Sequence, residues 1–316
     1  MHNRDRLILF AGRSGQKLGQ SIAQCLETEL SPREFVQFSN ENIKVRILEN
    51  VREADVFIVQ TSSPPLHENI VELLISIDAI KHASARRVTA VLPYFPYVRS
   101  DKKDEPRISI TARLMADLIA AAGADRILTM NLHSPQIQGF FKIPGDQLDA
   151  APILCDYLRR KDLSNTVIVA PDAGSAKRAG AYATRLDLPL AILDKRRSDD
   201  TESPEILHVI GEVEGRTCLI IDDEIRTGGS LHETVEALRH LGAEKIYAAC
   251  VHPVFCGKAV ERINAAKLEE IIVTDTVPLS EKDDAVNNLQ VLSVAPLFAN
   301  AIRSINEGES VSALFR

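Results

Sequence analysis

The sequence lacks the cysteine spacings that build zinc sites and disulfide frameworks. Its five cysteines include no C-x-x-C pair, and three of them lie inside apolar runs. We therefore expect reduced thiols in the protein core instead of metal ligands or disulfides. The cysteines are Cys25, Cys155, Cys218, Cys250 and Cys256.

Long apolar runs and an excess of positive charge are also missing. No apolar segment approaches the length of a membrane-spanning helix, and the N-terminal run LILF is predicted to begin a strand instead of a signal peptide. The net charge of -7 disfavours a general binder of nucleic acid or of membrane surfaces. We expect a cytoplasmic protein with no nucleic-acid or membrane partner, in which local basic groups hold any phosphate.

The common nucleotide-binding signatures are absent as well. The motif G-x-x-x-x-G-K-[ST] occurs nowhere, and the glycines of GRSGQKLG miss the G-x-G-x-x-G spacing. What is present is a chain of 316 residues, 45% hydrophobic and 26% charged, which is typical of a globular protein with room for two domains. A bound nucleotide would therefore need another arrangement of residues.

Strand and helix patterns alternate along the chain, which predicts an α/β fold with mostly parallel sheets flanked by helices. The expected strands cover residues 7–10, 55–60, 88–92, 167–170, 190–193 and 218–221. The expected helices include one that ends at residue 26, one at 68–82 and one at 108–122. Two polar segments without periodicity, 93–106 and 198–205, are predicted to be loops, the second of them mobile.

An internal similarity divides the chain into two parts. A helix, Gly123, a strand and His133 are repeated as a helix, Gly242, a strand and His252. Glycine at each of these positions can end its helix in a left-handed conformation. The repeat predicts two tandem domains of related fold, one of residues 1–148 joined by the tail 304–316, and one of residues 149–303.

The densest group of polar residues follows one of the expected strands. Residues 218–221 predict a buried parallel strand that stops at Asp222 and Asp223, and an amphipathic helix begins after Gly229. The loop between them offers backbone N–H groups, two hydroxyls and the positive end of a helix dipole, which suit a phosphate monoester, while the carboxylates can accept hydrogen bonds from sugar hydroxyls. The alternative is an ordinary strand-to-helix turn with an acidic cap. The loop residues are Thr227, Gly228, Gly229 and Ser230.

This loop resembles the phosphoribosyl pyrophosphate loop of type I phosphoribosyltransferases and of ribose-phosphate pyrophosphokinases. Six further stretches, in order along nearly the whole chain, resemble the pyrophosphokinase family: FSN at 38–40, SDKKD at 100–104, QIQGFF at 136–141, PDAGSAKR at 171–178, Lys195 with Arg197, and GESVSALF at 308–315. The resemblance implies two tandem type I phosphoribosyltransferase-like domains, of which only the second keeps the loop. It also implies transfer of the diphosphoryl group of ATP to the anomeric hydroxyl of ribose 5-phosphate, which gives AMP and phosphoribosyl pyrophosphate.

The same resemblance implies a role for each matching residue. The implied ATP-binding residues are Phe38, Asn40, Asn42, Arg99, Ser100 and Asp101. The implied ribose 5-phosphate residues are Asp222, Asp223, Arg226, Thr227, Gly228, Gly229 and Ser230. Lys195 and Arg197 would be catalytic, and His133 and Asp172 would serve Mg²⁺. A homo-oligomer of dimers that form a hexamer, with ATP bound across a subunit contact, is implied too, as is an allosteric phosphate or ADP site near Arg52, Ser84, Ser310 and Ser312.

Several positions depart from the family pattern. Asn42 replaces a Glu and Ser100 replaces a Gln, and both can still hydrogen-bond a base. Asn131 replaces an Asp and removes a charge beside His133. Arg226 replaces an Asp and reverses the charge in the phosphate loop, where we expect it to bind the 5-phosphate in preference to solvent or a neighbouring carboxylate. Further departures are Arg46 and Ile108.

Two functions from different classes are consistent with these residues. The first is an active pyrophosphokinase, because the phosphate-loop, cationic and metal residues are all present. The second is a weakly active or inactive regulatory paralogue that binds active subunits. A phosphoribosyltransferase that acts on a base ranks third, because such an enzyme would not need the ATP-side motifs of the first half.

Overall fold

The computed structural model describes residues 6–196 and 205–315, and the chain divides into two compact units. Unit 1 comprises Met1–Asp149, Thr276–Pro278 and Ser293–Arg316, and unit 2 comprises Ala150–Asp275 and Leu279–Leu292. The division after Asp149 falls beside the boundary expected from the sequence. The C-terminal segment of unit 1 begins at Ser293 instead of residue 304, because helix α8 (Ala295–Glu307) packs against helix α1 (Gln16–Cys25) of the same unit.

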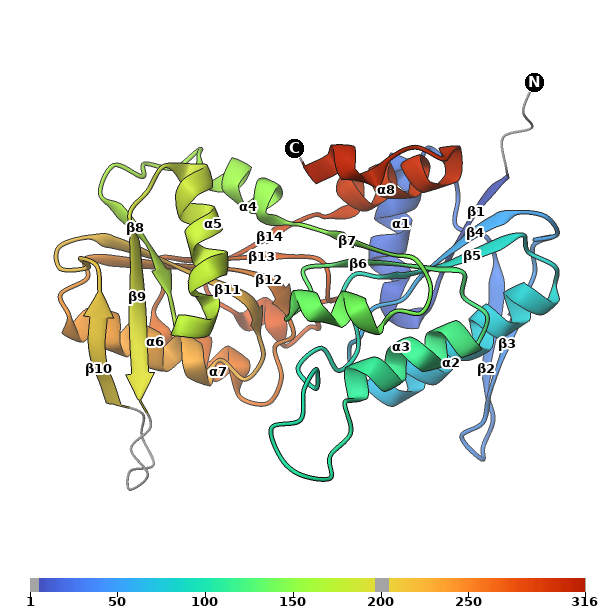
Figure 1. Cartoon of the computed structure of the whole chain (residues 1–316), viewed down its shortest axis with the longest axis horizontal. Coiled ribbons are helices and arrows are strands. Elements are labelled where there is room, and N and C mark those ends of the chain that lie inside the picture. Colours follow the sequence, from blue (N-terminus) through green and yellow to red (C-terminus); the bar gives the residue numbers. More distant parts are fainter. Residues whose placement is uncertain (1–5, 197–204, 316) are drawn as a thin grey trace. The chain divides into compact units, whose positions relative to one another are not determined.

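Unit 1 is built on a five-stranded parallel sheet with the strand order β1-β4-β5-β6-β7. The strands are β1 (Leu7–Ala11), β4 (Asp55–Val59), β5 (Arg87–Leu92), β6 (Arg126–Met130) and β7 (Gly145–Leu148). Besides α1 and α8, the unit contains α2 (Leu66–His82) and α3 (Thr111–Ala121), which contact each other (Figure 1). All five residues of β4 are buried, as expected for a strand that helices cover on both faces.

A separate antiparallel hairpin of unit 1 lies outside this sheet. It consists of β2 (Arg33–Gln37) and β3 (Ile43–Ile47), and β3 packs against α2. Most of its residues are only half-buried, and charged side chains interrupt its apolar pattern. The sequence reasoning above did not predict it.

Unit 2 is built on a seven-stranded sheet with the order β10-β9-β8-β11-β12-β13-β14. Only the pair of β9 (Leu190–Arg196) and β10 (Glu205–Ile210) is antiparallel. The other strands are β8 (Thr166–Ala170), β11 (Thr217–Ile225), β12 (Lys245–Pro253), β13 (Glu270–Thr274) and β14 (Leu289–Leu292). The helices are α4 (Ala151–Leu158), α5 (Ala176–Leu186), α6 (Gly229–His240) and α7 (Ala259–Ala266).

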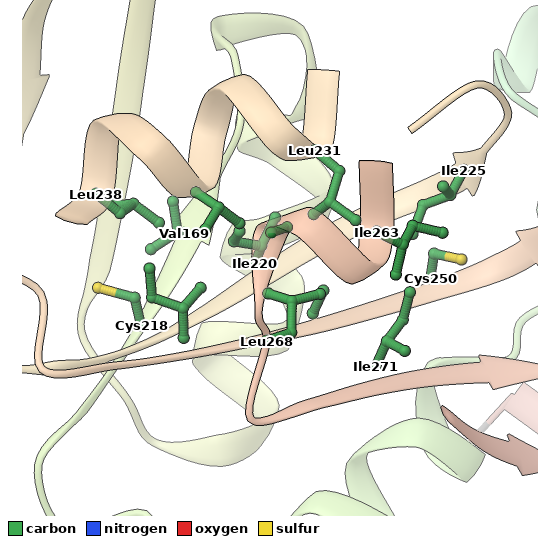
Figure 2. Packing of buried hydrophobic residues seen from close by; sticks show 14 of the residues in the cluster. Val169, Cys218, Ile220, Ile225, Leu231, Leu238, Cys250, Ile263, Leu268 and Ile271 are labelled. Carbon is green, nitrogen blue, oxygen red and sulfur yellow. The ribbon is translucent and has the colours of Figure 1, made fainter. Parts of the chain in front are cut away.

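One hydrophobic core cluster of unit 2 lies between the sheet and helices α6 and α7. Figure 2 shows Cys218 of β11 and Cys250 of β12 packed among leucine, isoleucine and valine side chains of this core. Cys155 is buried as well, so three cysteines are core residues as predicted, and all five are free thiols. The prediction is wrong for Cys25, which is exposed, and for Cys256, which is partly exposed, because both lie near the end of an element.

Two local predictions are confirmed and one needs correction. Gly123 and Gly242 follow α3 and α6 with φ angles of 106° and 83°, the left-handed conformation expected after each helix. Strand β11 does not stop at Asp222 and Asp223 but continues to Ile225, because β12 pairs with it as far as Pro253. Its pairing with β8 ends at Ile220, so the two carboxylates lie where only one neighbouring strand remains.

The two predicted loops have different outcomes. Residues 93–106 contain no helix or strand, as expected. The segment 198–205 lies outside the described residues except for Glu205, which begins β10. In the part of the chain that the structure describes, no helix is both long enough and apolar enough to cross a membrane.

Candidate functional site

Several of the predicted residues lie at one edge of the unit 2 sheet. Strands β8, β9 and β11 are parallel neighbours, so their carboxyl ends lie at the same edge. Asp172 follows β8, Asp222 and Asp223 lie near the end of β11, and Lys195 lies near the end of β9. The carboxyl edge of a parallel sheet is the usual ligand site of α/β folds. Arg197, the second predicted catalytic residue, lies outside the described residues.

The paired carboxylates share a cation that the sequence did not assign to the site. Nη1 of Arg178, on α5, lies 3.4 Å from Oδ1 of Asp222 and 3.1 Å from Oδ1 of Asp223. The side chain of Asp223 is only 5% exposed, whereas that of Asp222 is 30% exposed. Burial and the neighbouring charge of Asp223 raise the pKa of Asp222 to about 8, and Arg178 opposes this rise.

The loop predicted to bind phosphate leads into a helix start, as the sequence predicts. Gly228, at the N-terminus of α6, has φ 71° and ψ 2°, a conformation that favours glycine. A Cβ at this position would lie 3.3 Å from the carbonyl oxygen of Ala259, so the close approach of α7 also favours glycine. The first N–H groups of a helix have no acceptor within the helix and are available to an anion.

Residues from the β12–α7 connection and from α7 contact the same loop. The backbone N–H of Cys256 donates to the carbonyl oxygen of Arg226 at 2.9 Å. Nη1 of Arg262, on α7, donates to the carbonyl oxygen of Thr227 at 3.1 Å. Arg262 is therefore a second arginine beside the loop that the sequence reasoning missed, since no local pattern connects it to Thr227.

Arg226 makes an ion pair within its own strand-loop segment. Its Nε lies 3.3 Å from Oε1 of Glu224, whose side chain is only 4% exposed, while the side chain of Arg226 is 47% exposed. The pair involves Nε, and a guanidinium has five N–H donors, so the same arginine can also bind a phosphate. Its predicted role as a phosphate ligand stays a prediction.

The predicted ATP-binding residues lie on two segments of unit 1. Phe38, Asn40 and Asn42 form the turn between β2 and β3, where the backbone N–H of Phe38 donates to the carbonyl oxygen of Asn42 at 2.8 Å. The second segment follows β5 and contains Arg99, Ser100 and Asp101.

Two residues that depart from the family pattern have structural contacts in unit 1. The hydroxyl of Ser100 accepts the backbone N–H of Thr111 at the start of α3, at 3.1 Å. Nδ2 of Asn131 donates to Oδ1 of Asp149 at 3.0 Å. An aspartate at 131 would place two carboxylates in contact, whereas the amide of Asn131 can donate a hydrogen bond to the carboxylate of Asp149.

The predicted magnesium residues lie in different units. Asp172 is exposed, and its Oδ1 accepts the backbone N–H of Ser175 at 2.8 Å. His133 follows β6 and is half-buried. Within the described ranges, no group of three or more His, Cys, Asp and Glu side chains could hold a metal. An exposed carboxylate nevertheless suits Mg²⁺, which commonly binds one or two carboxylates together with substrate phosphates.

Comparisons with known proteins match nearly the whole chain to one protein family. A family model described as the N-terminal domain of ribose phosphate pyrophosphokinase matches residues 7–123, and one described as the phosphoribosyl synthetase-associated domain matches residues 201–316. The ribose-phosphate pyrophosphokinase of Deinococcus radiodurans is 51% identical over 99% of this chain and 98% of that protein. The one from Bacillus caldolyticus is 44% identical over 98% of both chains. The crystal structure of phosphoribosylpyrophosphate synthetase from Mycobacterium smegmatis has a TM-score of 0.90 and 40% identity, and the match covers 96% of this chain and 100% of that one.

Proposed function

The chain belongs to the ribose-phosphate pyrophosphokinase family and is an enzyme of that type, and we propose how its residues carry out the reaction. The diphosphoryl group of ATP passes to the C1 hydroxyl of ribose 5-phosphate and gives phosphoribosyl pyrophosphate and AMP. The observation that carries the site assignment is the edge of the unit 2 sheet, where Asp222 and Asp223 precede a glycine loop at the start of α6. No observation favours the regulatory alternative.

In the proposed mechanism, unit 2 binds the sugar phosphate. The loop Thr227–Ser230 and the start of α6 hold the 5-phosphate, and Asp222 and Asp223 accept hydrogen bonds from ribose hydroxyls. The C1 hydroxyl gives up its proton to water as its oxygen forms a bond to the β-phosphorus of ATP, and the bond from that phosphorus to the oxygen of the departing AMP breaks. Negative charge spreads over the equatorial oxygens, so the task of the protein is positioning and cationic stabilisation. We assign that stabilisation to Lys195 and Arg197.

The ATP side of the reaction is assigned to unit 1. Phe38 is 48% exposed at the turn between β2 and β3, which leaves its ring available to stack on a base. Arg99 and Asp101 follow β5, and His133 follows β6, the neighbouring strand. We propose that His133 and Asp172 serve Mg²⁺, which would neutralise phosphate charge when bound.

We also propose a cytoplasmic homo-oligomer, with dimers that assemble into a hexamer. The exposed aromatic ring of Phe38 supports a subunit contact at the hairpin. An allosteric phosphate or ADP site is proposed near Arg52 and Ser84, and the backbone N–H of Glu53 donates to the carbonyl oxygen of Ser84 at 2.9 Å, which brings these two segments together. Ser310 and Ser312 are exposed residues of the same unit.

The purified protein is expected to form AMP from ATP only when ribose 5-phosphate is present. An excess of chelator should lower the rate by at least about tenfold, because a divalent cation supplies much of the charge neutralisation at the phosphates. Coupled detection of AMP and of phosphoribosyl pyrophosphate measures both products. AMP release without the sugar, or a full rate in the presence of chelator, would contradict the assignment.

Arg226→Asp is expected to raise the KM for ribose 5-phosphate about fivefold and to weaken the salt dependence of that KM, because one screened charge contact is lost. Steady-state kinetics at two ionic strengths measure both effects, and Arg226→Lys, which keeps the charge, is the control. If Arg226→Asp, alone or with Asn131→Asp, instead converts a barely active protein into a fast enzyme, the chain is the regulatory paralogue.

A further inference from the structure

A buried carboxylate connects four segments of unit 1. Glu72, on α2, has a fully buried side chain. Its Oε1 accepts the backbone N–H of Arg13 at 3.1 Å and lies 2.6 Å from Nη2 of Arg33. Its Oε2 accepts Nε of Arg13 at 3.0 Å and Nε2 of Gln60 at 3.4 Å. These partners belong to the turn after β1, to β2 and to the residue that follows β4.

Both arginines extend this contact to the β2–β3 hairpin. Arg33 is the first residue of β2, and its Nε donates to the carbonyl oxygen of Ala11 at 2.6 Å, which joins the hairpin to the end of β1. The guanidinium of Arg13 lies 4.0 Å from the centre of the Phe35 ring in β2, a cation–π contact. One carboxylate therefore holds two side-chain contacts to the base of the hairpin.

The surrounding backbone leaves the cluster little freedom to move. A Cβ at Gly12 would lie 1.9 Å from Oε1 of Gln60, and a Cβ at Gly15 would lie 2.2 Å from the carbonyl oxygen of Val59. The turn after β1 reaches the cluster only because both positions are glycine. The hairpin is therefore attached, through Arg33, to a part of the sheet where the turn after β1 and the end of β4 pack closely together.

The cluster is poorly explained by stability alone. Taking a carboxylate and guanidinium groups out of water is costly, and apolar side chains of similar volume would pack α2 against the sheet as well. Among the described residues, Nη1 of Arg33 and Oε1 of Gln60 are buried without a hydrogen-bond partner, which adds to that cost. What the charged cluster provides is a fixed orientation of the two guanidinium groups.

We propose that Glu72 is a positioning residue for the nucleotide site. Through Arg33, and through Arg13 on the Phe35 ring, it fixes the direction of the hairpin whose turn carries the ATP-binding residues. The bonds within the turn set its shape, including the backbone N–H of Asn42 that donates to Oδ1 of Asn40 at 3.2 Å, but its direction depends on the base. The inference rests on the proposed function, because it takes this turn to be part of the ATP site.

The test compares Glu72→Gln with Glu68→Gln. Both glutamates lie on α2 and contact Arg13, but the side chain of Glu68 is 44% exposed and its Oε2 lies 3.2 Å from Nη2 of Arg13. Each variant removes one negative charge beside the same arginine. Only Glu72→Gln weakens the buried link to Arg33, so Glu68→Gln is a matched control.

Glu72→Gln is expected to raise the KM for ATP at least about fivefold, because small displacements of substrate-positioning groups have large kinetic effects. The KM for ribose 5-phosphate and kcat should stay within about twofold, since unit 2 is unchanged. Hydrogen exchange of the backbone amides of residues 33–47 should be at least about tenfold faster than in the wild type. Glu68→Gln should match the wild type in every measurement.

Unchanged exchange in the hairpin of Glu72→Gln would overturn the inference, as would an equal rise in both KM values or a fall in kcat alone. Hydrogen exchange needs no turnover, so it tests the bracing of the hairpin even if the wild type forms no AMP, a result that would instead refute the proposed function. If Glu72→Gln does not fold, Phe35→Leu cuts only the contact from Arg13 to the hairpin. This variant should show the same selective rise in the KM for ATP, and a normal KM for ATP together with normal exchange would again overturn the inference.

Discussion

Replacement of Arg178 with alanine is expected to lower kcat/KM for ribose 5-phosphate by about tenfold to a hundredfold, because a hydrogen bond to a charged group contributes about 1.5–3 kcal/mol. The guanidinium lies within 3.4 Å of Asp222 and 3.1 Å of Asp223. In the variant, this cation no longer offsets the repulsion between Asp222 and Asp223, the two side chains that accept hydrogen bonds from the sugar in the proposed mechanism. Steady-state kinetics with ribose 5-phosphate as the varied substrate measure the loss.

The pH profile provides a second measurement on the same variant. The pKa of Asp222 is raised to about 8 by burial and by Asp223, and Arg178 is the cation that opposes the rise. Because its removal raises the pKa of Asp222 further, the ionised form appears only at higher pH, and the acid limb of kcat/KM should move to higher pH. The stability of the fold should also depend on pH. A carboxyl whose pKa is higher in the folded than in the unfolded protein lowers the free energy of unfolding as the pH rises between the two pKa values. The melting temperature of Arg178→Ala should therefore continue to fall above about pH 8, where the contribution of Asp222 in the wild type levels off.

Two controls separate the role of Arg178 from a general change of charge on α5. Lys177 is an exposed neighbour on the same helix, and Lys177→Ala should keep the rate and pH profile of the wild type. Arg178→Lys keeps the charge but loses the fork geometry, so it should be intermediate. Equal kinetics for Arg178→Ala and Lys177→Ala would show that Arg178 has no part in the sugar site.

The sequence predicted those parts of the site whose residues are adjacent in the chain. The strand, the two carboxylates, the glycine loop and the helix start all lie within 218–240, so a local pattern was sufficient, and the left-handed conformation of Gly228 agrees with it. Arg178 contacts Asp222 across 44 residues and Arg262 contacts Thr227 across 35 residues. No local periodicity encodes such contacts, because they arise only when strands and helices pack.

The difference between local patterns and distant contacts also explains which strands could be predicted from the sequence. Buried parallel strands such as β4 and β11 appear as continuous apolar runs, which the sequence reveals directly. The half-exposed hairpin β2–β3 and the short strands β7 and β14 have mixed polarity, so their burial depends on neighbours that are distant in the chain. The end of β11 was misplaced for a related reason, since two acids are an unusual continuation of a buried strand and only the pairing with β12 explains it.

Lys195→Ala is expected to lower kcat at least about a hundredfold, or about 2.7 kcal/mol, with a smaller change in the KM for either substrate. Lys195 lies near the end of β9, and β9 is the parallel neighbour of β8, whose carboxyl end leads to Asp172. The charge on the transferring group is greatest in the transition state, so a cation that contacts this group mainly then changes kcat more than KM. We expect the same pattern for Arg197→Ala.

Single-turnover measurement of AMP formation, with ATP and ribose 5-phosphate both saturating, separates this chemical step from product release. Lys195→Arg keeps the positive charge and should recover part of the rate, whereas Lys177→Ala on α5 controls for the loss of a lysine elsewhere in unit 2. A rise in KM with an unchanged kcat would make Lys195 a ground-state binding residue. In the proposed mechanism, the positive charge that stabilises the transferring group would then have to come from other cations at this edge of the sheet, of which Arg226 is the nearest in sequence to Asp222 and Asp223.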